Sequence, residues 1–358
     1  MNTHDVAVVG AGIVGLAHAL AAARQGSRVV VVDRDAQANG ASVRNFGFVT
    51  VTGQQAGATW RRAMRSRDVW AEVAPQAGIA VLHSGLWFAA RRPEAMAVLE
   101  AFAAGPMGEG CRMLPPPAPL GQSILGALYS PHELRVEPRT AIPALAAWLE
   151  AAHGVEFRRG VAVLDAAPGR LQTTGGTIEA GRVVVCPGTD LVQLFPGAIA
   201  QRKTTLCKLH MLRLADPGWR LPGAVMSDLG LVRYLGYAPT PDLRARLEAE
   251  QPEHLANGVH LIVVQSADGS LVVGDSHHYA ATPDPFQPDH VDALILDEAR
   301  AVLDLPADLP VTERWIGVYP SGQEACFRET IAPGLDLVMV TSGTGMSTSF
   351  ALAEETFA

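Results

Sequence analysis

The chain has 358 residues, of which 48% are hydrophobic and 18% charged, so it can bury one large core or two medium ones. Its formal net charge of −8 argues against nucleic acid and against an anionic membrane surface as the main partner. The expected partner is a small molecule, and nothing in the pattern predicts an oligomeric state.

The four cysteines, Cys111, Cys186, Cys207 and Cys326, are scattered without a CxxC pair or zinc-ligand spacing. This usage is typical of reduced thiols, and it predicts no metal site. No apolar run approaches the roughly 20 residues that span a bilayer. A strand predicted from about residue 5 leaves no space for a signal peptide. These features predict a cytoplasmic protein.

Residues 5–33 are predicted to form a strand, a glycine turn, a helix and a second strand. DVAVVG is a short apolar strand, IVGLAHALAAARQG an alanine-rich helix that Gly26 ends, and RVVVVD a fully buried strand. Two buried parallel strands joined through a helix make a βαβ unit.

The turn between the first strand and the helix has the pattern G-x-G-x-x-G, formed by Gly10, Gly12 and Gly15. The first glycine permits the turn, the second lets the backbone approach a pyrophosphate, and the third lets the helix pack on the strand. The helix N-terminus favours phosphate groups. Asp33 ends the second strand, where its carboxylate can accept hydrogen bonds from a ribose diol. The pattern predicts dinucleotide binding, and the alternative is a glycine turn in an α/β domain that binds no nucleotide.

The rest of the chain predicts an α/β nucleotide domain interrupted by an α+β domain. A helix is expected over 58–74, followed by a proline-rich connection at MLPPPAPLGQS. From about 206 to 310, alternating apolar runs predict a mostly antiparallel sheet. The chain then returns to a strand, LDLVMV, a glycine turn and the start of a helix. We expect a discontinuous, Rossmann-like nucleotide domain with a parallel sheet over 1–85, 135–205 and 311–358, and a substrate domain over 86–134 and 206–310.

GASVRNFG, at 40–47, resembles the small-residue turn that wraps FAD in the D-amino-acid oxidase family, which includes glycine and sarcosine oxidases. A NAD-binding half would normally continue here with another helix and strand. GVAVLDA is similar to the strand that contacts adenine, VVVCPGTD to the strand whose terminal glycine passes beside FAD, and SGTGMSTSF to the turn and helix facing the flavin. A helix N-terminus stabilises the negative charge of a reduced flavin.

This resemblance covers nearly the whole chain and implies a non-covalently bound FAD. The residues that the motif and the resemblance together assign to FAD are Gly10, Gly12, Ile13, Val14, Gly15, Asp33, Arg34, Ala41, Ser42, Asn45, Phe46, Gly47, Val161, Gly188, Gly343, Thr344, Gly345, Met346 and Ser347.

GASVRNFGFV, TGQ, RSRDVW and SGTGMSTSFALAEE look closest to a branch of the family associated with aminophosphonate breakdown. The likeness implies oxidation of 2-aminoethylphosphonate or its N-methyl form. Hydride would pass from the carbon beside a neutral amine to FAD, and water would hydrolyse the imine to an aldehyde. The alternative within the family is an oxidase or dehydrogenase of glycine, sarcosine or a D-amino acid. Two alternatives from other classes are a NAD-dependent dehydrogenase and a flavin-binding subunit without its own turnover.

Amino-acid-oxidising members carry an arginine in a G-x-R-P turn, where it binds the substrate carboxylate. This chain has WIGVYPSG, so the matching position is Tyr319, which offers one hydroxyl and no charge. The departure indicates either a different acid group or a clamp built elsewhere, for which Arg233 and Arg328 are candidates.

The residues predicted to act on the substrate are cationic or aromatic. They are Tyr319, His277, Tyr234 and Arg233, with Tyr237 as the alternative to Tyr234. Weaker candidates are Lys208 and His210, which share one face of a strand, and His278, Arg65 and Arg67, each of which also fits an ordinary surface position.

Two positions differ from the sarcosine oxidases. Val272 stands where those enzymes have a lysine that promotes reaction with oxygen, so the electron acceptor stays open. Cys326 lies in the segment through which they attach FAD covalently, but its neighbours match poorly, and we expect an inert thiol.

Overall fold

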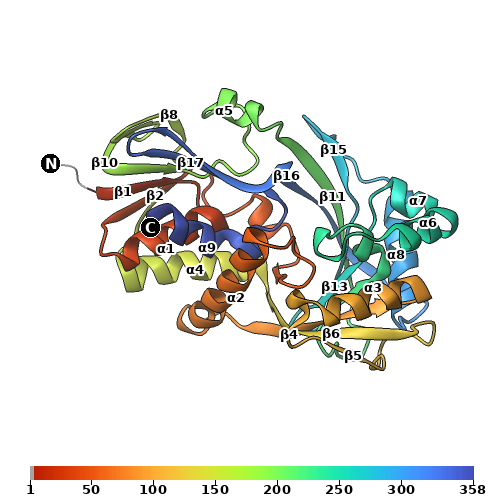
Figure 1. The fold of residues 1–358 in the computed structure, drawn as a ribbon. Coiled ribbons are helices and arrows are strands. Elements are labelled where there is room, and N and C mark those ends of the chain that lie inside the picture. Colours follow the sequence, from red (N-terminus) through yellow and green to blue (C-terminus); the bar gives the residue numbers. More distant parts are fainter. Residues whose placement is uncertain (1–3) are drawn as a thin grey trace.

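The structure, a computed structural model, describes residues 4–358. Figure 1 shows two lobes: one holds β1, β10, α1 and α9, and the other holds β4, β6 and α6 to α8, with β11 and β16 running between them. The predicted fold class, a Rossmann-like domain with a parallel sheet joined to a domain with a mostly antiparallel sheet, is confirmed.

The strands are β1 His4–Val9, β2 Val29–Asp33, β3 Phe48–Val49, β4 Val81–Ala90, β5 Arg112–Leu114, β6 Gly126–Val136, β7 Glu156–Arg159, β8 Val163–Ala167, β9 Arg170–Thr173, β10 Gly176–Val185, β11 Thr205–Leu214, β12 Ala224–Ser227, β13 Ile262–Gln265, β14 Leu271–Gly274, β15 His278–Ala280, β16 Val311–Ala332 and β17 Leu335–Ser342. The α-helices are α1 Ile13–Arg24, α2 Ala58–Gln76, α3 Pro93–Ala104, α4 Pro138–His153, α5 Pro196–Gln201, α6 Pro241–Glu250, α7 Pro252–Ala256, α8 Asp289–Val302 and α9 Gly345–Phe357.

The parallel sheet has the order β7–β2–β1–β10–β17. Successive side chains of a strand point to opposite faces, and here both faces are covered. Val6 and Val8 pack with α1, α4 and α9, whereas Ala7 packs toward β8, β9 and α5. Double coverage explains why β1 and β2 are almost continuous runs of valine.

The second sheet is mostly antiparallel. Its order is β16–β11–β14–β13–β12–β4–β6–β5, and only the β12–β4 pair is parallel. The first part of β16 pairs with β11, and its last part pairs with β17 of the parallel sheet, at Ser321 and then, after an irregularity, from Cys326 onward. One strand of 22 residues therefore connects the two sheets.

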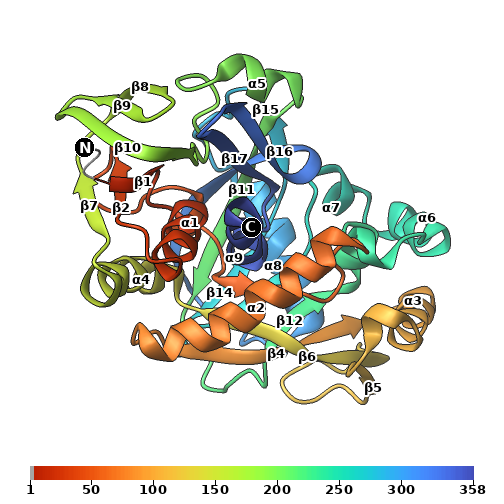
Figure 2. The ribbon, with the colours of Figure 1, turned by 60° about the vertical axis from the view of Figure 1, so that its left-hand side comes forward.

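Helices α1, α2 and α9 lie against one another beside the parallel sheet (Figure 2). The predicted helix at 58–74 is observed as α2 over Ala58–Gln76. Trp70 of α2 is fully buried and packs edge-to-face on Phe350 of α9, and its indole N–H donates to the Met346 carbonyl at 2.8 Å. This contact fixes the first turn of α9, which faces the cavity described below.

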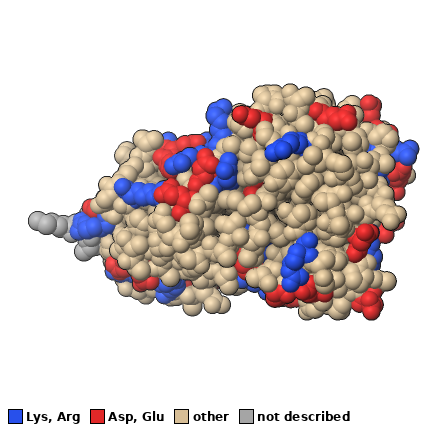
Figure 3. All heavy atoms as spheres, turned by 90° about the horizontal axis from the view of Figure 1, so that it is seen from below, with Lys and Arg blue, Asp and Glu red and all other residues tan. Residues whose placement is uncertain are grey.

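The predicted domain boundaries stay a prediction. Those at 85/86 and 134/135 fall within β4 and β6, and β16 takes part in both sheets. No helix among residues 4–358 is long and apolar enough to cross a membrane. On the face drawn in Figure 3, acidic and basic side chains are interspersed across a largely uncharged surface.

Candidate active site

A cavity of about 570 Å³ is lined from both sheets. It begins at the carboxyl ends of β1, β2 and β10, marked by Gly10, Asp33 and Cys186. Ligands of open parallel sheets bind outside the carboxyl ends of the strands. The opposite wall includes Ile262 of β13 and Tyr319 of β16.

The glycine turn at the cavity has no space for larger residues. Gly10 has φ of +99°, and a Cβ added to it would collide with the Cys186 carbonyl. A Cβ on Gly15 would collide with the Gly10 carbonyl. The Ile13 N–H at the start of α1 donates to Ser42 Oγ at 2.9 Å. The N–H groups of Val14 and Gly15, which follow in the first turn of this helix, have no intrahelical acceptor. The turn therefore fits the pyrophosphate of FAD, with Ser42 beside it.

Asp33 combines a structural contact with access to the cavity. Its carboxylate accepts the Ala11 N–H at 2.6 Å and the Asp35 N–H at 2.8 Å. These bonds hold the glycine turn against the end of β2, and a carboxylate keeps further lone pairs for a ribose diol. Arg34 pairs with Asp190 at 2.8 Å across the same end of the cavity.

The N-terminus of α9 forms another wall, through Gly343, Thr344 and Gly345. Ser347, in the first turn of α9, accepts the Thr50 N–H through its Oγ at 2.8 Å. This bond ties α9 to the segment after β3. The start of this 13-residue helix can stabilise negative charge on a bound flavin.

All but one of the residues predicted to bind FAD line this cavity. Gly47 is the exception, because it lies outside the lining. It has φ of +66°, and a side chain there would collide with the Val136 carbonyl, so its glycine is required for packing. Contact of the other residues with FAD stays a prediction.

Arg233, Tyr234, His277 and Tyr319 line the same cavity, as the sequence predicted for a common pocket. Arg233 Nη2 lies 3.2 Å from the hydroxyl oxygens of both Tyr279 and Tyr319. The Tyr319 ring also lies against Gly343 at the start of the α9 turn. Arg233 therefore brings a guanidinium to Tyr319, the position for which the resemblance implies an arginine, and its role toward a substrate stays a prediction.

Arg233 has no acidic ion-pair partner among residues 4–358. Burial would lower its pKa, but Tyr319 and Tyr279 oppose this effect, and the resulting pKa lies above its ordinary value. The guanidinium therefore stays charged. Burial also raises the pKa of Tyr319 and Tyr234, so both hydroxyls stay protonated and can donate.

Two further polar residues, His260 and Asp275, face this part of the cavity and form a cluster with His277. Burial would raise the pKa of Asp275, but His260, His277 and Arg233 outweigh it and lower that pKa. Burial lowers the pKa of His277 well below its ordinary value. At neutral pH the pair therefore consists of a carboxylate and a neutral imidazole.

Our sequence reasoning missed His260, Asp275 and Tyr279. The sequence holds one signal for His260 and Asp275: each is a polar residue at the end of an apolar strand, His260 before β13 and Asp275 directly after β14. Their backbones exchange two hydrogen bonds, from the His260 N–H at 3.1 Å and from the Asp275 N–H at 3.0 Å. Only the hairpin register shows that they meet.

The weaker candidates lie outside the cavity lining. Four of them form ion pairs: Lys208 with Asp284, His210 with Asp292, Arg65 with Glu354 and Arg67 with Asp68. Arg328 donates to the Glu355 and Thr356 carbonyls, His278 of β15 lies opposite Lys208 of β11, and Cys326 contacts Arg62. Tyr237 packs between Phe88 and Phe102, and Val272 is a core residue of β14. Of the two arginines named as candidates for a carboxylate clamp, Arg233 lines the cavity and Arg328 does not, so only Arg233 stays a candidate.

Comparison with known proteins identifies the family. The profile of the family "DAO: FAD dependent oxidoreductase" matches residues 5–358. The chain belongs to this family. Its cofactor is FAD, as predicted, and the predicted class of enzyme, an FAD-dependent oxidoreductase, is confirmed.

Several known proteins resemble the chain over most of its length. The bifunctional protein ThiO/ThiG of Nostoc sp. is 25% identical over 93% of this chain, which spans about half of that relative. Glycine oxidase from Bacillus cereus has a TM-score of 0.79 at 18% identity, covering 99% of this chain and 93% of that one. Iminodiacetate oxidase from Chelativorans sp. has a TM-score of 0.73 at 18% identity, covering 97% and 93%. These two structures share the fold.

Proposed function

We propose that the protein oxidises the amine of a small anionic substrate, an aminophosphonate such as 2-aminoethylphosphonate or its N-methyl form. The observation that carries this proposal is the partly buried guanidinium of Arg233, which lies 3.2 Å from two tyrosine hydroxyls and forms no ion pair with an acidic side chain among the described residues. The Asp275 carboxylate acts on Arg233 only through space and lies 2.7 Å from His260, so an anionic substrate would give Arg233 a directly bonded counter-ion.

The donor set around Arg233 suits a phosphonate. The group carries three oxygens in a tetrahedral arrangement, and Arg233, Tyr279 and Tyr319 approach from different segments of the chain. Arginine binds phosphate-like groups through several N–H donors at once. Tyr279 is 54% exposed, so the substrate can enter along its side.

FAD, when bound, supplies an acceptor for the hydride of the carbon beside the amine. The residues of this chain bind the anion, orient that carbon and exclude water. Tyr319 contacts both Arg233 and the Gly343 turn at the FAD end of the cavity, so the anion would be held at a fixed distance from the cofactor. Release of the imine to water gives an aldehyde and ammonia or a primary amine.

A second candidate is oxidation of glycine, sarcosine or a D-amino acid. The same unpaired Arg233 favours it, since a guanidinium also binds a carboxylate through two N–H donors. Glycine oxidase and iminodiacetate oxidase, which share the fold, are named for substrates with carboxylates.

The test is anaerobic bleaching of the flavin absorbance by 2-aminoethylphosphonate, its N-methyl form, sarcosine, glycine and D-alanine in turn. We expect bleaching by an aminophosphonate at concentrations where the amino acids leave the spectrum unchanged. Bleaching by sarcosine, glycine or D-alanine alone would overturn the aminophosphonate proposal in favour of the second candidate.

A matched pair of variants tests the role of Arg233. Arg233→Lys removes the planar donor set and should weaken substrate binding about 10- to 100-fold, because hydrogen bonds to charged groups contribute about 1.5–3 kcal/mol. Arg328→Lys is the control, since Arg328 lies outside the cavity lining. Titration of the flavin spectrum with substrate measures both dissociation constants, and equal values would show that Arg233 does not bind the anion.

A further inference from the structure

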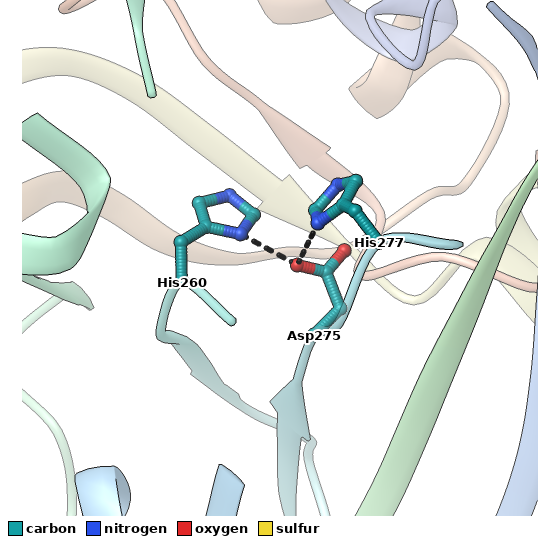
Figure 4. A group of neighbouring side chains, drawn as sticks. All are labelled: His260, Asp275 and His277. Carbon is teal, nitrogen blue, oxygen red and sulfur yellow. Dashed lines mark ion pairs between the residues drawn. The ribbon is translucent and has the colours of Figure 1, made fainter. Parts of the chain in front are cut away.

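The cluster of His260, Asp275 and His277 is a polar wall of the cavity that anion binding does not explain. Figure 4 shows both imidazole rings on one side of the Asp275 carboxylate, with Nδ1 of each turned toward it. Asp275 Oδ1 lies 2.7 Å from His260 Nδ1 and 3.8 Å from His277 Nδ1. The three side chains are at most 5% exposed.

The tautomer of His277 follows from one contact. Its Nδ1 lies 2.9 Å from the Gly258 carbonyl oxygen, which can only accept a hydrogen bond. The ring proton is therefore on Nδ1, and Nε2 carries a lone pair. Since His277 lines the cavity, this ring has one anchored nitrogen and one nitrogen available to a ligand. That is the arrangement of a general base.

A metal ion fits the same residues less well. Two ligands held about 2.0–2.1 Å from a tetrahedral zinc would lie about 3.3 Å apart, whereas His260 Nδ1 and Asp275 Oδ1 are 2.7 Å apart. The Nδ1 of His277 already donates to Gly258. Arg233, whose charge acts on both Asp275 and His277, would repel a cation.

We infer that His277, which the Gly258 carbonyl holds in place, accepts the proton of the substrate ammonium and that the Asp275 carboxylate, 3.8 Å away, stabilises the imidazolium that forms; this inference rests on the proposed function. The transfer breaks an N–H bond of the ammonium, forms one at Nε2, and leaves the neutral amine whose carbon gives its hydride to FAD. A base is needed because an alkylammonium with a pKa of about 10.4 is neutral in only about one molecule in a thousand at pH 7.4.

The neighbouring charges connect this base to anion binding. Burial lowers the pKa of His277, Asp275 raises it, and Arg233 and His260 lower it further. The ring of Tyr319, 6.2 Å away, and the Gly258 carbonyl complete its surroundings. A bound anion would neutralise Arg233, so the proton affinity of His277 would rise when substrate is present.

The test is the limiting rate of anaerobic flavin reduction by 2-aminoethylphosphonate as a function of pH, in the wild type and in His277→Asn, Asp275→Asn and His278→Asn. His277→Asn should lower the rate about 100-fold near pH 7. It should also move the rise of the profile to higher pH, where the free amine is neutral. Asp275→Asn should lower the rate near pH 7 by a smaller factor and move the low-pH limb of the profile to lower pH, because loss of this carboxylate lowers the pKa of His277 and makes it a weaker base. His278→Asn is the control, because His278 lies outside the cavity lining.

Binding of propylphosphonate, which has a methyl group in place of the amine, provides a second readout through the flavin absorbance. His277→Asn and His278→Asn should bind it as the wild type does, which shows an intact anion site, and Asp275→Asn, which removes a negative charge that acts on Arg233, should bind it at least as tightly. If the wild type does not bind it, the proposed function fails. If binding is normal and His277→Asn keeps the wild-type pH profile, only the inference fails. Loss of the wild-type rate on treatment with EDTA and its recovery with zinc would also overturn the inference.

Discussion

Arg233 and Tyr319 bring a guanidinium and a hydroxyl to one point of the cavity from two segments of the chain. Arg233 lies in the turn between two short 3-10 helices, and its Nη2 lies 3.2 Å from the hydroxyl of Tyr319 in β16, the position for which the family resemblance implies an arginine. If Arg233 binds the substrate anion, as we propose, its donors reach that anion from the turn at residue 233 and not from β16.

Gly15 is a position where one methyl group should decide cofactor retention. In Gly15→Ala the added Cβ would collide with the Gly10 carbonyl, and such overpacking costs about 1–3 kcal/mol. Relief requires α1 to move away from the turn that faces FAD. We expect purified Gly15→Ala to lose most of its FAD, measured as the ratio of flavin to protein absorbance. Gly197→Ala is the control, because no atom lies within 4 Å of its added Cβ; equal ratios in both variants would contradict the role of the turn.

His83 should make the fold less stable in acid. Its Nε2 accepts the Gln265 N–H at 2.8 Å, which needs the neutral ring. Burial and the nearby Arg135 lower its pKa to about 4. The unfolded chain, with a pKa of about 6.5, binds this proton first as the pH falls, so the stability is complete above pH 6.5 and is lost progressively toward pH 4.

At pH 5 this amounts to about 1–2 kcal/mol, allowing for partial exposure of the ring. His83→Gln keeps an acceptor but cannot titrate in this range, so its unfolding free energy should fall less than that of the wild type between pH 7 and pH 5. Urea unfolding at both pH values measures the difference. Identical falls would show that His83 does not contribute.

Among the elements, α2 and α9 are tied together most strongly by Trp70. Trp70→Ala should destabilise the protein by about 3–5 kcal/mol, because a fully buried indole and its hydrogen bond to Met346 are lost. Arg65→Ala, which removes only the partly exposed ion pair with Glu354, should cost less than about 1 kcal/mol. Denaturant unfolding compares the two. A similar loss in both variants would mean that surface charge, rather than the buried ring, joins these helices.

Local patterns account for what could be predicted from the sequence. The first βαβ unit was predicted because valine runs, a glycine turn and an alanine-rich helix each determine their own structure. β16 was not predicted at its full length, because Pro320 and Gly322 are typical of a turn, yet Pro320 lies in the strand opposite Leu206. The meeting of His260 and Asp275 depends on strand register, which a single sequence does not specify.

The whole molecule should unfold as one unit. The chain passes repeatedly between the sheets, and β16 pairs in both. Calorimetry should therefore show one transition, which added FAD shifts to higher temperature; free FAD at 100 times its dissociation constant adds about 2.7 kcal/mol. Two separate transitions, of which only one responds to FAD, would contradict this coupling. Addition of NAD serves as the control and should leave the transition unchanged.

The continuity of β16 also limits how such a protein can acquire a new specificity. Insertion or deletion of one residue in a strand turns every later side chain to the opposite face. In β16 such a change before Tyr319 would break the pairing of Tyr319 with Cys207 of β11, whereas the irregularity between Ser321 and Cys326 separates this register from the pairing with β17. Under the proposed function, a new specificity is therefore reached more readily by single substitutions in the cavity wall, such as those at positions 233 and 319, than by changes in strand length.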